Sequence, residues 1–139
     1  MNYVDDKHVQ SWLAEHDSAL LPAAMTAEFA QVLEKLPWIG PVLDWSAIGV
    51  IRLSLDSPDF WNDVNRTKLG PFAYGFLMYS GGEPGIVARL CDILQGLDVL
   101  TWKAPGDRFF CAATRVNEWT LEPQVFGAYD GADHLLIRA

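Results

Sequence analysis

The sequence contains few of the thiol and imidazole side chains that most often bind metals or transfer protons. Two cysteines and three histidines occur in 139 residues. Cys91 and Cys111 both lie in apolar segments, so buried free thiols are expected rather than a disulfide or a reactive cysteine. His8, His16 and His134 lack the i, i+3 or i+4 spacing that helical metal sites use. The sequence therefore predicts no metal site, no cofactor and no catalytic residue of these types.

Motifs for nucleotide binding and covalent catalysis are also missing. The chain has no Gly-x-Ser-x-Gly nucleophile motif, no P-loop, no dinucleotide fingerprint and no calcium-binding loop. One glycine-rich segment remains, Ser80–Gly85, and it is expected to leave a strand and enter a helix, where backbone N–H groups can hold an anion. Pro84 removes one donor and Glu83 adds a negative charge, so a simple turn is the favoured interpretation.

Long apolar runs and clustered basic residues are absent too. No apolar segment approaches the ~18 residues of a membrane-spanning helix. The first six residues lack the basic start and apolar core of a secretory signal, which predicts a cytoplasmic protein. The ten Lys and Arg residues are scattered and outnumbered by eighteen Asp and Glu, so neither nucleic acid nor an anionic membrane is an expected partner.

What the chain does have is acidic charge, and most of it lies in one half. Residues 1–63 hold ten acidic and three basic residues, a balance of −7, whereas residues 64–139 hold eight acidic and seven basic residues. An uneven field of this kind repels anionic partners and steers basic ones toward the protein. The charge pattern therefore favours a basic protein partner.

The N-terminal part of the sequence has helical periodicity. Val9, Trp12 and Leu13 predict a first helix, with Asp5 or Asp6 as the capping residue. A second helix is predicted to begin at Thr26 as N-cap and to end at Pro37. Its apolar side chains recur at i, i+3, i+4 and i+7 and are expected to be buried: Phe29, Val32, Leu33 and Leu36.

The remainder of the sequence alternates between strand and helix patterns. A short helix is expected to start at Ser57 and Pro58, and an apolar helix is expected over residues 86–97. Pro123 is expected to break, bulge or border its strand. Turns are predicted at residues 104–107 and 130–133, and strands at residues 47–55, 72–79, 99–103, 108–116, 119–129 and 134–138.

These patterns together predict an α+β fold. We expect residues 1–139 to form a single domain, because the length suits one core and no linker or repeat interrupts it. The expected sheet has about five or six strands, largely antiparallel or mixed, with three to four helices mostly on one face.

The most concrete surface feature is a set of three aspartates around the short helix. Asp56 and Asp59 lie at its N-terminal end, and Asp63 follows Asp59 at i+4. The set is either an ordinary solvated face or an acidic ridge for partner binding. In the second case exposed Trp61 or Trp38 is the expected aromatic anchor.

Three classes of function are compatible with the sequence. The favoured one is a non-enzymatic binding protein, such as an inhibitor or immunity-type protein that covers the active-site cleft of a basic toxin or nuclease. The second is a small enzyme or ligand-binding domain that uses the Ser80–Gly85 loop. The third is a structural subunit that buries the apolar connector at residues 37–45 in an oligomer.

Overall fold

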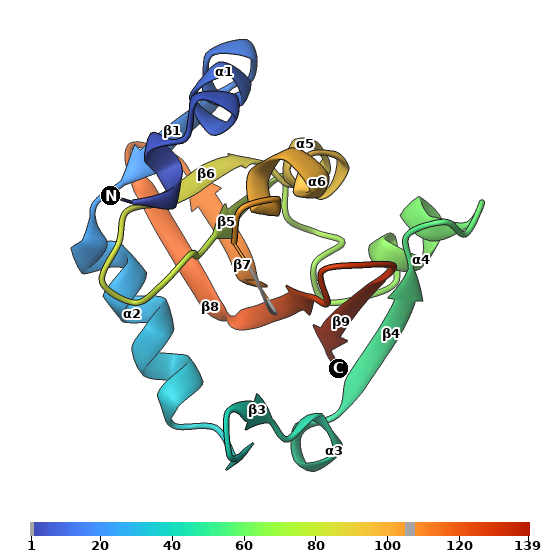
Figure 1. The fold of residues 1–139 in the computed structure, drawn as a ribbon. Helices are drawn as coiled ribbons and strands as arrows, with labels where there is room; N and C mark the ends of the chain where they lie inside the picture. The colour runs from blue at the N-terminus through green and yellow to red at the C-terminus, as the bar shows by residue number, and fades with distance from the viewer. Residues whose placement is uncertain (1, 105–107) are drawn as a thin grey trace.

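The computed structural model describes residues 2–104 and 108–139, which form an α+β fold around one large sheet (Figure 1). The helical segments are η1 (Tyr3–Asp5), α1 (Lys7–Glu15), α2 (Ala23–Glu34), α3 (Trp45–Ile48), α4 (Phe60–Asn65), α5 (Leu90–Gln95) and α6 (Leu97–Thr101). The strands are β1 (Ser18–Leu21), β2 (Trp38–Ile39), β3 (Val42–Leu43), β4 (Val50–Ser54), β5 (Tyr74–Leu77), β6 (Gly85–Arg89), β7 (Arg108–Arg115), β8 (Trp119–Tyr129) and β9 (His134–Arg138).

The predicted α+β class is confirmed, with a sheet of seven strands rather than five or six. Their order is β1-β6-β5-β7-β8-β9-β4, and β2 and β3 form a separate hairpin. Every ladder among the described strands is antiparallel, so the mixed pairing that the sequence left open does not occur there. The central strand predicted over residues 72–79 is β5, which lies between β6 and β7.

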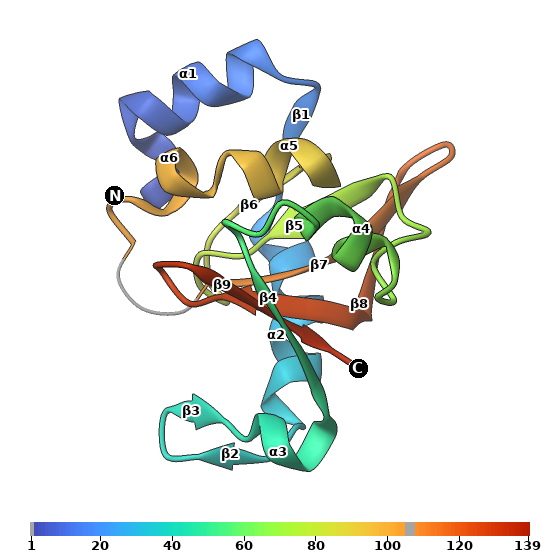
Figure 2. The ribbon, with the colours of Figure 1, turned by 90° about the vertical axis from the view of Figure 1, so that its right-hand side faces the viewer.

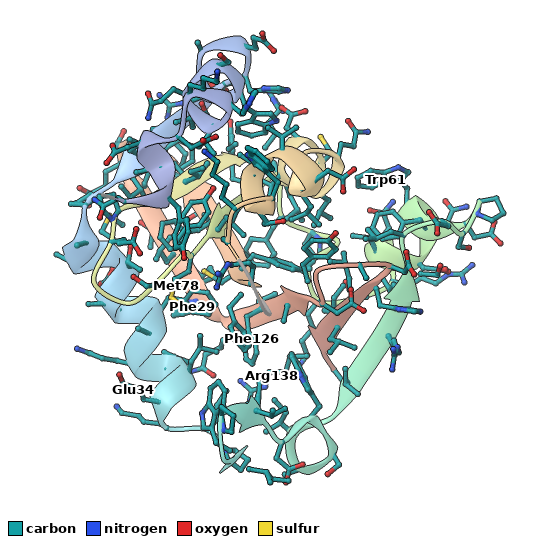
Figure 3. All side chains as sticks on the ribbon, in the orientation of Figure 1. Phe29, Glu34, Trp61, Met78, Phe126 and Arg138 are labelled. Carbon is teal, nitrogen blue, oxygen red and sulfur yellow. The ribbon has the colours of Figure 1, made fainter. Side chains whose placement is uncertain are left out.

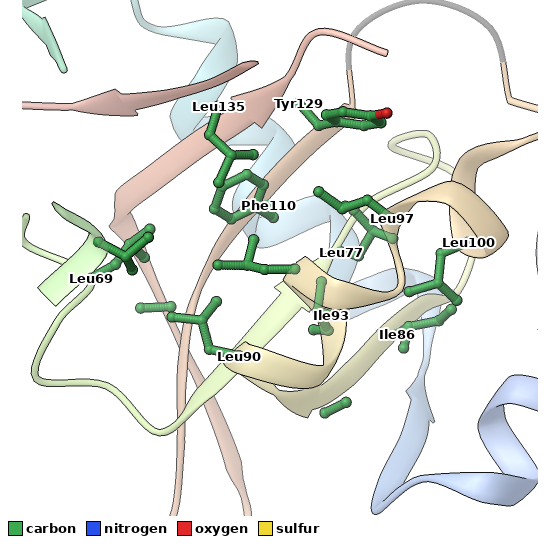
Figure 4. Packing of buried hydrophobic residues seen from close by; sticks show 14 of the residues in the cluster. Leu69, Leu77, Ile86, Leu90, Ile93, Leu97, Leu100, Phe110, Tyr129 and Leu135 are labelled. Atoms are coloured by element: carbon green, nitrogen blue, oxygen red, sulfur yellow. The ribbon is translucent and has the colours of Figure 1, made fainter. Parts of the chain in front are cut away.

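Hydrophobic side chains cover both faces of the sheet. Figure 2 shows α1, α5 and α6 on one side of it and α2 on the other. The larger core lies under α1, α4, α5 and α6, and Figure 4 shows part of it around Leu77, Ile93 and Phe110. The smaller core lies under α2 and contains Phe29 and Phe126. Most helices are thus on one face, as the sequence predicts.

The second helix starts earlier than its sequence suggests. Pro22 is the N-cap in an extended conformation, and Thr26 is therefore a fully buried residue inside α2, not its cap. The prediction of Thr26 as N-cap is wrong because Pro22, with its φ already fixed, can start the helix one turn earlier. Phe29 and Leu33 are buried, as predicted (Figure 3 shows Phe29). The other two residues of the stripe, Val32 and Leu36, are only half-buried, less than predicted.

The apolar run at residues 86–97 is the main error of the sequence interpretation. Its first part is strand β6, which pairs with both β1 and β5, and the helix begins only at Leu90. The predicted strand over residues 99–103 does not form, because residues 99–101 belong to α6 and residues 102–103 to the turn after it. A continuous apolar run shows neither the helical nor the strand period, and the β-branched pair Ile86 and Val87 suits a strand buried on both faces.

Two other predicted elements are displaced. The strand expected over residues 47–55 starts at Val50, because α3 occupies residues 45–48 and Gly49 turns the chain at a φ of 84°. The short helix α4 starts at Phe60 with Asp59 as N-cap. Ser57 Oγ instead accepts a hydrogen bond from the Asp59 N–H at 3.2 Å in the preceding turn.

The C-terminal strands agree with their predicted positions. β7, β8 and β9 match the predicted strands, and the turn at residues 130–133 connects β8 to β9. Between β7 and β8 the register shifts from Cys111↔Phe126 to Ala112↔Glu122, so Pro123 lies in a bulge, as expected for a residue without an N–H. Three residues of the turn predicted at 104–107, at positions 105–107, lie outside the described residues.

The two cysteines differ in exposure. Cys111 is fully buried, as predicted, but Cys91 is exposed at the start of α5, so the expectation of two buried thiols is wrong for Cys91. The reason is the same early strand: once residues 85–89 form β6, the short helix after it presents Cys91 to solvent. No helix in the described part of the chain has the length and apolar character needed to cross a membrane.

Candidate functional site

A surface groove of about 470 Å³ lies where α4, the α5–α6 segment and the β8–β9 turn meet. We call it the acidic groove. Figure 1 shows α4 beside β4, with α5 and α6 above the middle of the sheet. The loop after β4 contributes its first wall, and the residues that line it are Leu55, Asp56, Ser57, Phe60, Trp61, Leu94, Gln95, Leu97, Asp98, Ala132 and Asp133.

Backbone hydrogen bonds hold the walls of the acidic groove together. The Leu55 N–H donates to the Asp133 C=O at 2.8 Å, which joins the loop after β4 to the β8–β9 turn. Within that turn, Asp130 Oδ1 accepts hydrogen bonds from the N–H groups of Ala132 at 2.8 Å and His134 at 3.1 Å. Asp and Gly form such turns readily, and Gly131 adopts the positive φ of 83° that the turn needs. The groove therefore has a defined backbone frame.

Every charged side chain among the described residues that line the groove is negative. Asp56, Asp98 and Asp133 line it, and no Lys, Arg or His is among its lining residues. The partly buried hydroxyl of Tyr129 lies near these charges: burial raises its pKa, and the negative charges of Asp98, Asp130 and Asp133 raise it further. Carboxylates from α6 and from the β8–β9 turn thus act on the same space, although they are more than thirty residues apart in sequence.

Asp130 stabilises the β8–β9 turn and is not among the residues that line the groove. Burial opposes ionisation of its carboxyl, but hydrogen bonds from Ala132 and His134 outweigh that effect and lower its pKa. Its second oxygen lies 3.4 Å from His134 Nδ1. Asp130 is therefore ionised at neutral pH, and its oxygens already have partners within the turn.

One exposed tryptophan lines the groove and a second lies in a neighbouring depression. Trp61 is 40% exposed on α4 and rests edge-on against the buried ring of Phe60, with the ring centroids 5.0 Å apart (Figure 3). Asp98 also borders a neighbouring depression of about 270 Å³ that contains Val99 and Trp102. Trp102 is 57% exposed, which is unusual for so large an apolar side chain. Exposed tryptophans of this kind are the residues that most often anchor protein interfaces.

The structure brings together only some of the residues predicted for this site. Asp56 and Trp61 line the groove, whereas Asp59 and Asp63 are outside its lining. Asp63 is half-buried and lies 3.7 Å from the guanidinium of Arg66, which offsets its charge. The acidic ridge is therefore narrower than its sequence suggests.

Trp38 belongs to a different part of the surface. It lies on β2, and its indole N–H donates to the Leu33 C=O at 2.8 Å while its ring packs edge-on against Phe109. The β2–β3 hairpin that carries it lies at the bottom of the view in Figure 1, apart from α4 at the right. The same hairpin presents two strongly exposed apolar residues, Ile39 at 67% and Val42 at 55%.

Sequence reasoning missed Asp98, Asp133 and Trp102. Trp102 was assigned to a strand over residues 99–103, and Asp98 to the connection between that strand and a helix ending at residue 97, whereas residues 97–101 form α6. Asp133 was interpreted only as a turn former. A helical period over residues 97–101 was the one available signal, since it places Leu97 and Leu100 inward and Asp98 outward.

The Ser80–Gly85 loop does not have the geometry expected of an anion site. It connects β5 to β6, and so it precedes no helix. Glu83 is occupied there: its Oε1 accepts the Tyr3 N–H at 3.1 Å and its Oε2 accepts the Ser80 hydroxyl at 2.6 Å. The loop thus ties the N-terminal segment to the sheet.

The remaining candidates for chemistry are the buried thiol of Cys111 and clusters of metal-ligating side chains. Burial raises the pKa of the Cys111 thiol far above its usual range, and the charge of Glu122 adds to the effect, so the thiol is un-ionised at neutral pH. Among residues 2–104 and 108–139, no three His, Cys, Asp or Glu side chains converge as metal ligands would.

Comparisons with known families and with curated proteins find no match to this chain. The case for a function therefore depends on the geometry and charge of the surface.

Proposed function

We propose that this protein is a non-enzymatic protein-binding module that captures a basic partner in the acidic groove. The observation that carries the proposal is the convergence of three carboxylates from three separate segments on one groove without a lining cation. Carboxylates arranged in this way attract Lys- and Arg-rich surfaces over long range and speed association. Trp61 and Trp102 supply the apolar contacts that slow dissociation.

The form of this function that suits the charge best is inhibition. Enzymes and toxins that act on nucleic acid hold their substrate in a cationic cleft, and an acidic surface competes for that cleft. We propose that the partner is such a protein, a basic toxin or nuclease, and that this chain acts as its inhibitor or immunity-type protein. Asp56, Asp98 and Asp133 would face the cleft, with Trp61 and Trp102 at its rim.

Reversing two charges inside the groove is expected to slow capture of the partner. The basic protein that the wild-type chain captures from lysate of its source cells would be purified and its binding kinetics measured. At physiological salt, the Asp98→Lys/Asp133→Lys variant should associate about tenfold more slowly than wild type. The matched control is Glu15→Lys/Glu34→Lys, which changes the net charge equally at exposed positions outside the groove.

The control should change the association rate by less than about twofold, because charges beyond ~8 Å are largely screened at that salt. Thermal unfolding should be nearly unchanged in both variants, since exposed charges contribute little to stability. Trp102→Ala should leave the association rate nearly unchanged and raise the dissociation rate of the complex about tenfold. Equal capture by the groove variant and the control, or no inhibition of the captured partner's activity, would contradict the proposal.

Asp59 and Asp63 remain predicted partner-binding residues at the margin of the groove. Their position on α4 allows them to steer a basic surface without contacting it. Reversing both to Lys should therefore reduce the association rate less than the Asp98→Lys/Asp133→Lys variant does, and should leave dissociation unchanged.

A second candidate function is favoured by the β2–β3 hairpin. Ile39 and Val42 are more than half exposed, as an oligomer contact formed by residues 37–45 would require. If the hairpin mediates self-association, sedimentation velocity should show a dimer or larger species whose fraction rises with concentration. Ile39→Lys/Val42→Lys should then be monomeric, whereas Val116→Lys, an exposed apolar residue elsewhere, should not. A wild-type chain that is monomeric at high micromolar concentration would exclude this function.

A further inference from the structure

The first half of β8 has one neighbouring strand and one open edge. β7 pairs with β8 along both halves, but β9 pairs only with residues 127–129. Within residues 2–104 and 108–139, no strand pairs with the outer edge of residues 119–122. An open strand edge of this kind is a template for another extended chain.

The register identifies which backbone groups face the open edge. The Met78 N–H donates to the Phe109 C=O at 3.0 Å across the ladder between β5 and β7. Successive residues of a strand direct their backbone groups to opposite neighbours, so Phe109 and every second residue after it bond to β5. The intervening β7 residues, including Ala112 and Thr114, bond to β8.

Ala112 pairs with Glu122 and Thr114 pairs with Thr120, so the backbone groups of those two β8 residues point toward β7. Trp119 and Leu121, which alternate with them, therefore direct their N–H and C=O groups away from the sheet. Two donors and two acceptors are thus presented in the spacing of a β-ladder.

A groove of about 510 Å³ runs between this edge and the first turns of α2. Figure 1 shows α2 beside β8, and the helix and strand are in contact. Met25, Leu121 and Pro123 give the groove an apolar floor, and Glu28 and Glu118 add two carboxylates. None of the described residues that line it is Lys, Arg or His. A strand added to β8 would place alternate side chains over this floor.

We propose that the outer edge of β8 is a strand-addition site for a short extended segment of another protein that alternates basic and apolar residues. Its backbone would bond to Trp119 and Leu121, and its apolar side chains would enter the groove beside Met25 and Leu121. Its basic side chains, which point to the other face of the sheet, would meet Glu118 and Glu122. This site is separate from the acidic groove and does not depend on the function proposed for that groove.

The site takes a short segment because both ends are closed. Pro123 has no N–H to donate, and the bulge that contains it bends β8 away. Beyond it, the Arg138 guanidinium donates to Gln124 Oε1 at 2.8 Å and covers the edge. The open stretch therefore matches a segment of about four to six residues.

A second copy of this chain is a poor occupant. Antiparallel pairing of two β8 edges about Thr120 would align Trp119 of one copy with Leu121 of the other, which satisfies the bonding groups. The same pairing sets Glu118 opposite Glu122 at both ends, and like charges placed directly opposite destabilise a ladder. The carboxylates thus favour a basic segment over self-pairing.

The test uses a synthetic hexapeptide of alternating lysine and valine, and hydrogen exchange of individual backbone amides followed by NMR. On addition of the peptide, exchange of the Trp119 and Leu121 amides should slow by at least about tenfold, because only bonded amides are protected. The Thr120 amide, already bonded to β7, should change little. An equivalent peptide with glutamate in place of lysine should give no protection.

Two variant pairs separate the backbone from the charge contribution. Trp119→Pro removes one edge donor at the first residue of the strand, where proline is tolerated, and Trp119→Ala removes the same side chain but keeps the N–H. Peptide affinity should fall at least about fivefold further in the proline variant than in the alanine variant. Glu118→Lys/Glu122→Lys should weaken binding roughly tenfold, and the exposed control Glu15→Lys/Glu34→Lys by less than about twofold.

An independent arm leaves the protein unchanged. A peptide N-methylated on the residues that bond to the edge cannot complete the ladder, and it should not bind. Protection of Leu121 that appears with protein concentration alone would show self-pairing and overturn the proposal. Peptide binding without protection of Leu121, or equal binding of the glutamate peptide, would overturn it as well. The two proposals can fail separately, because Asp98 and Asp133 line only the acidic groove. Asp98→Lys/Asp133→Lys should therefore leave binding of the lysine–valine peptide to β8 unchanged.

Discussion

Replacing Phe29 by alanine is expected to lower the free energy of unfolding by about 3–5 kcal/mol. Phe29 is fully buried on α2, and its ring centroid lies 6.2 Å from that of Phe126 on β8. The ring fills the space between a helix and a seven-stranded sheet, and a sheet cannot move inward to close the cavity that its removal leaves. Urea unfolding followed by tryptophan fluorescence measures the change.

Val32→Ala is the matched control for this substitution. It lies on the same helix but is only half-buried, so it should cost about 1 kcal/mol. Similar losses in the two variants would show that α2 is held by its helical propensity rather than by the core beneath it.

Gly85→Ala is expected to destabilise the protein by about 3 kcal/mol, at the upper end for over-packing. A Cβ atom at this position would overlap the ring of Phe76 and lie 2.8 Å from the Leu77 C=O. Both obstacles belong to β5, the strand next to β6 near the centre of the sheet, and the Phe76 ring is fully buried. Thermal and urea unfolding should both record the loss.

Gly82→Ala, in the same turn, is the control. No atom lies within 4 Å of its added Cβ, and its φ is not positive, so the free energy of unfolding should change by less than about 0.5 kcal/mol. If Gly85→Ala were as stable as Gly82→Ala, the close packing of β6 against β5 would be wrong.

The close packing at Gly85 also explains why the sequence predicted a helix where the structure has strand β6. The Ser80–Gly85 segment was expected to lead from a strand into an apolar helix over residues 86–97. In the structure Gly85 is the first residue of β6, and it is glycine because the Phe76 ring occupies the space of a side chain. That reason exists only once β5 and β6 are paired, so no local pattern contains it.

Where a helix or strand has one buried and one exposed face, the sequence by itself determined the element. The stripe of α2 and the alternation of β8 and β9 identified those elements because burial on one side repeats with the period of the backbone. The acidic character of the surface was equally a property of the sequence, since a charge is carried by its residue whatever the fold.

Only the tertiary structure decided which of those charges act together. Asp56, Asp98 and Asp133 come from three segments. Pairing of β4 with β9 brings the first and the third together. Asp98 joins them because residues 85–101 form β6, α5 and α6 in place of the single long helix predicted from the sequence. The groove at β8 likewise depends on how far β9 extends along its neighbour. Pairing between distant segments is selected by the packing of the whole core, and residues 35 or more apart therefore form a site that no local sequence pattern contains.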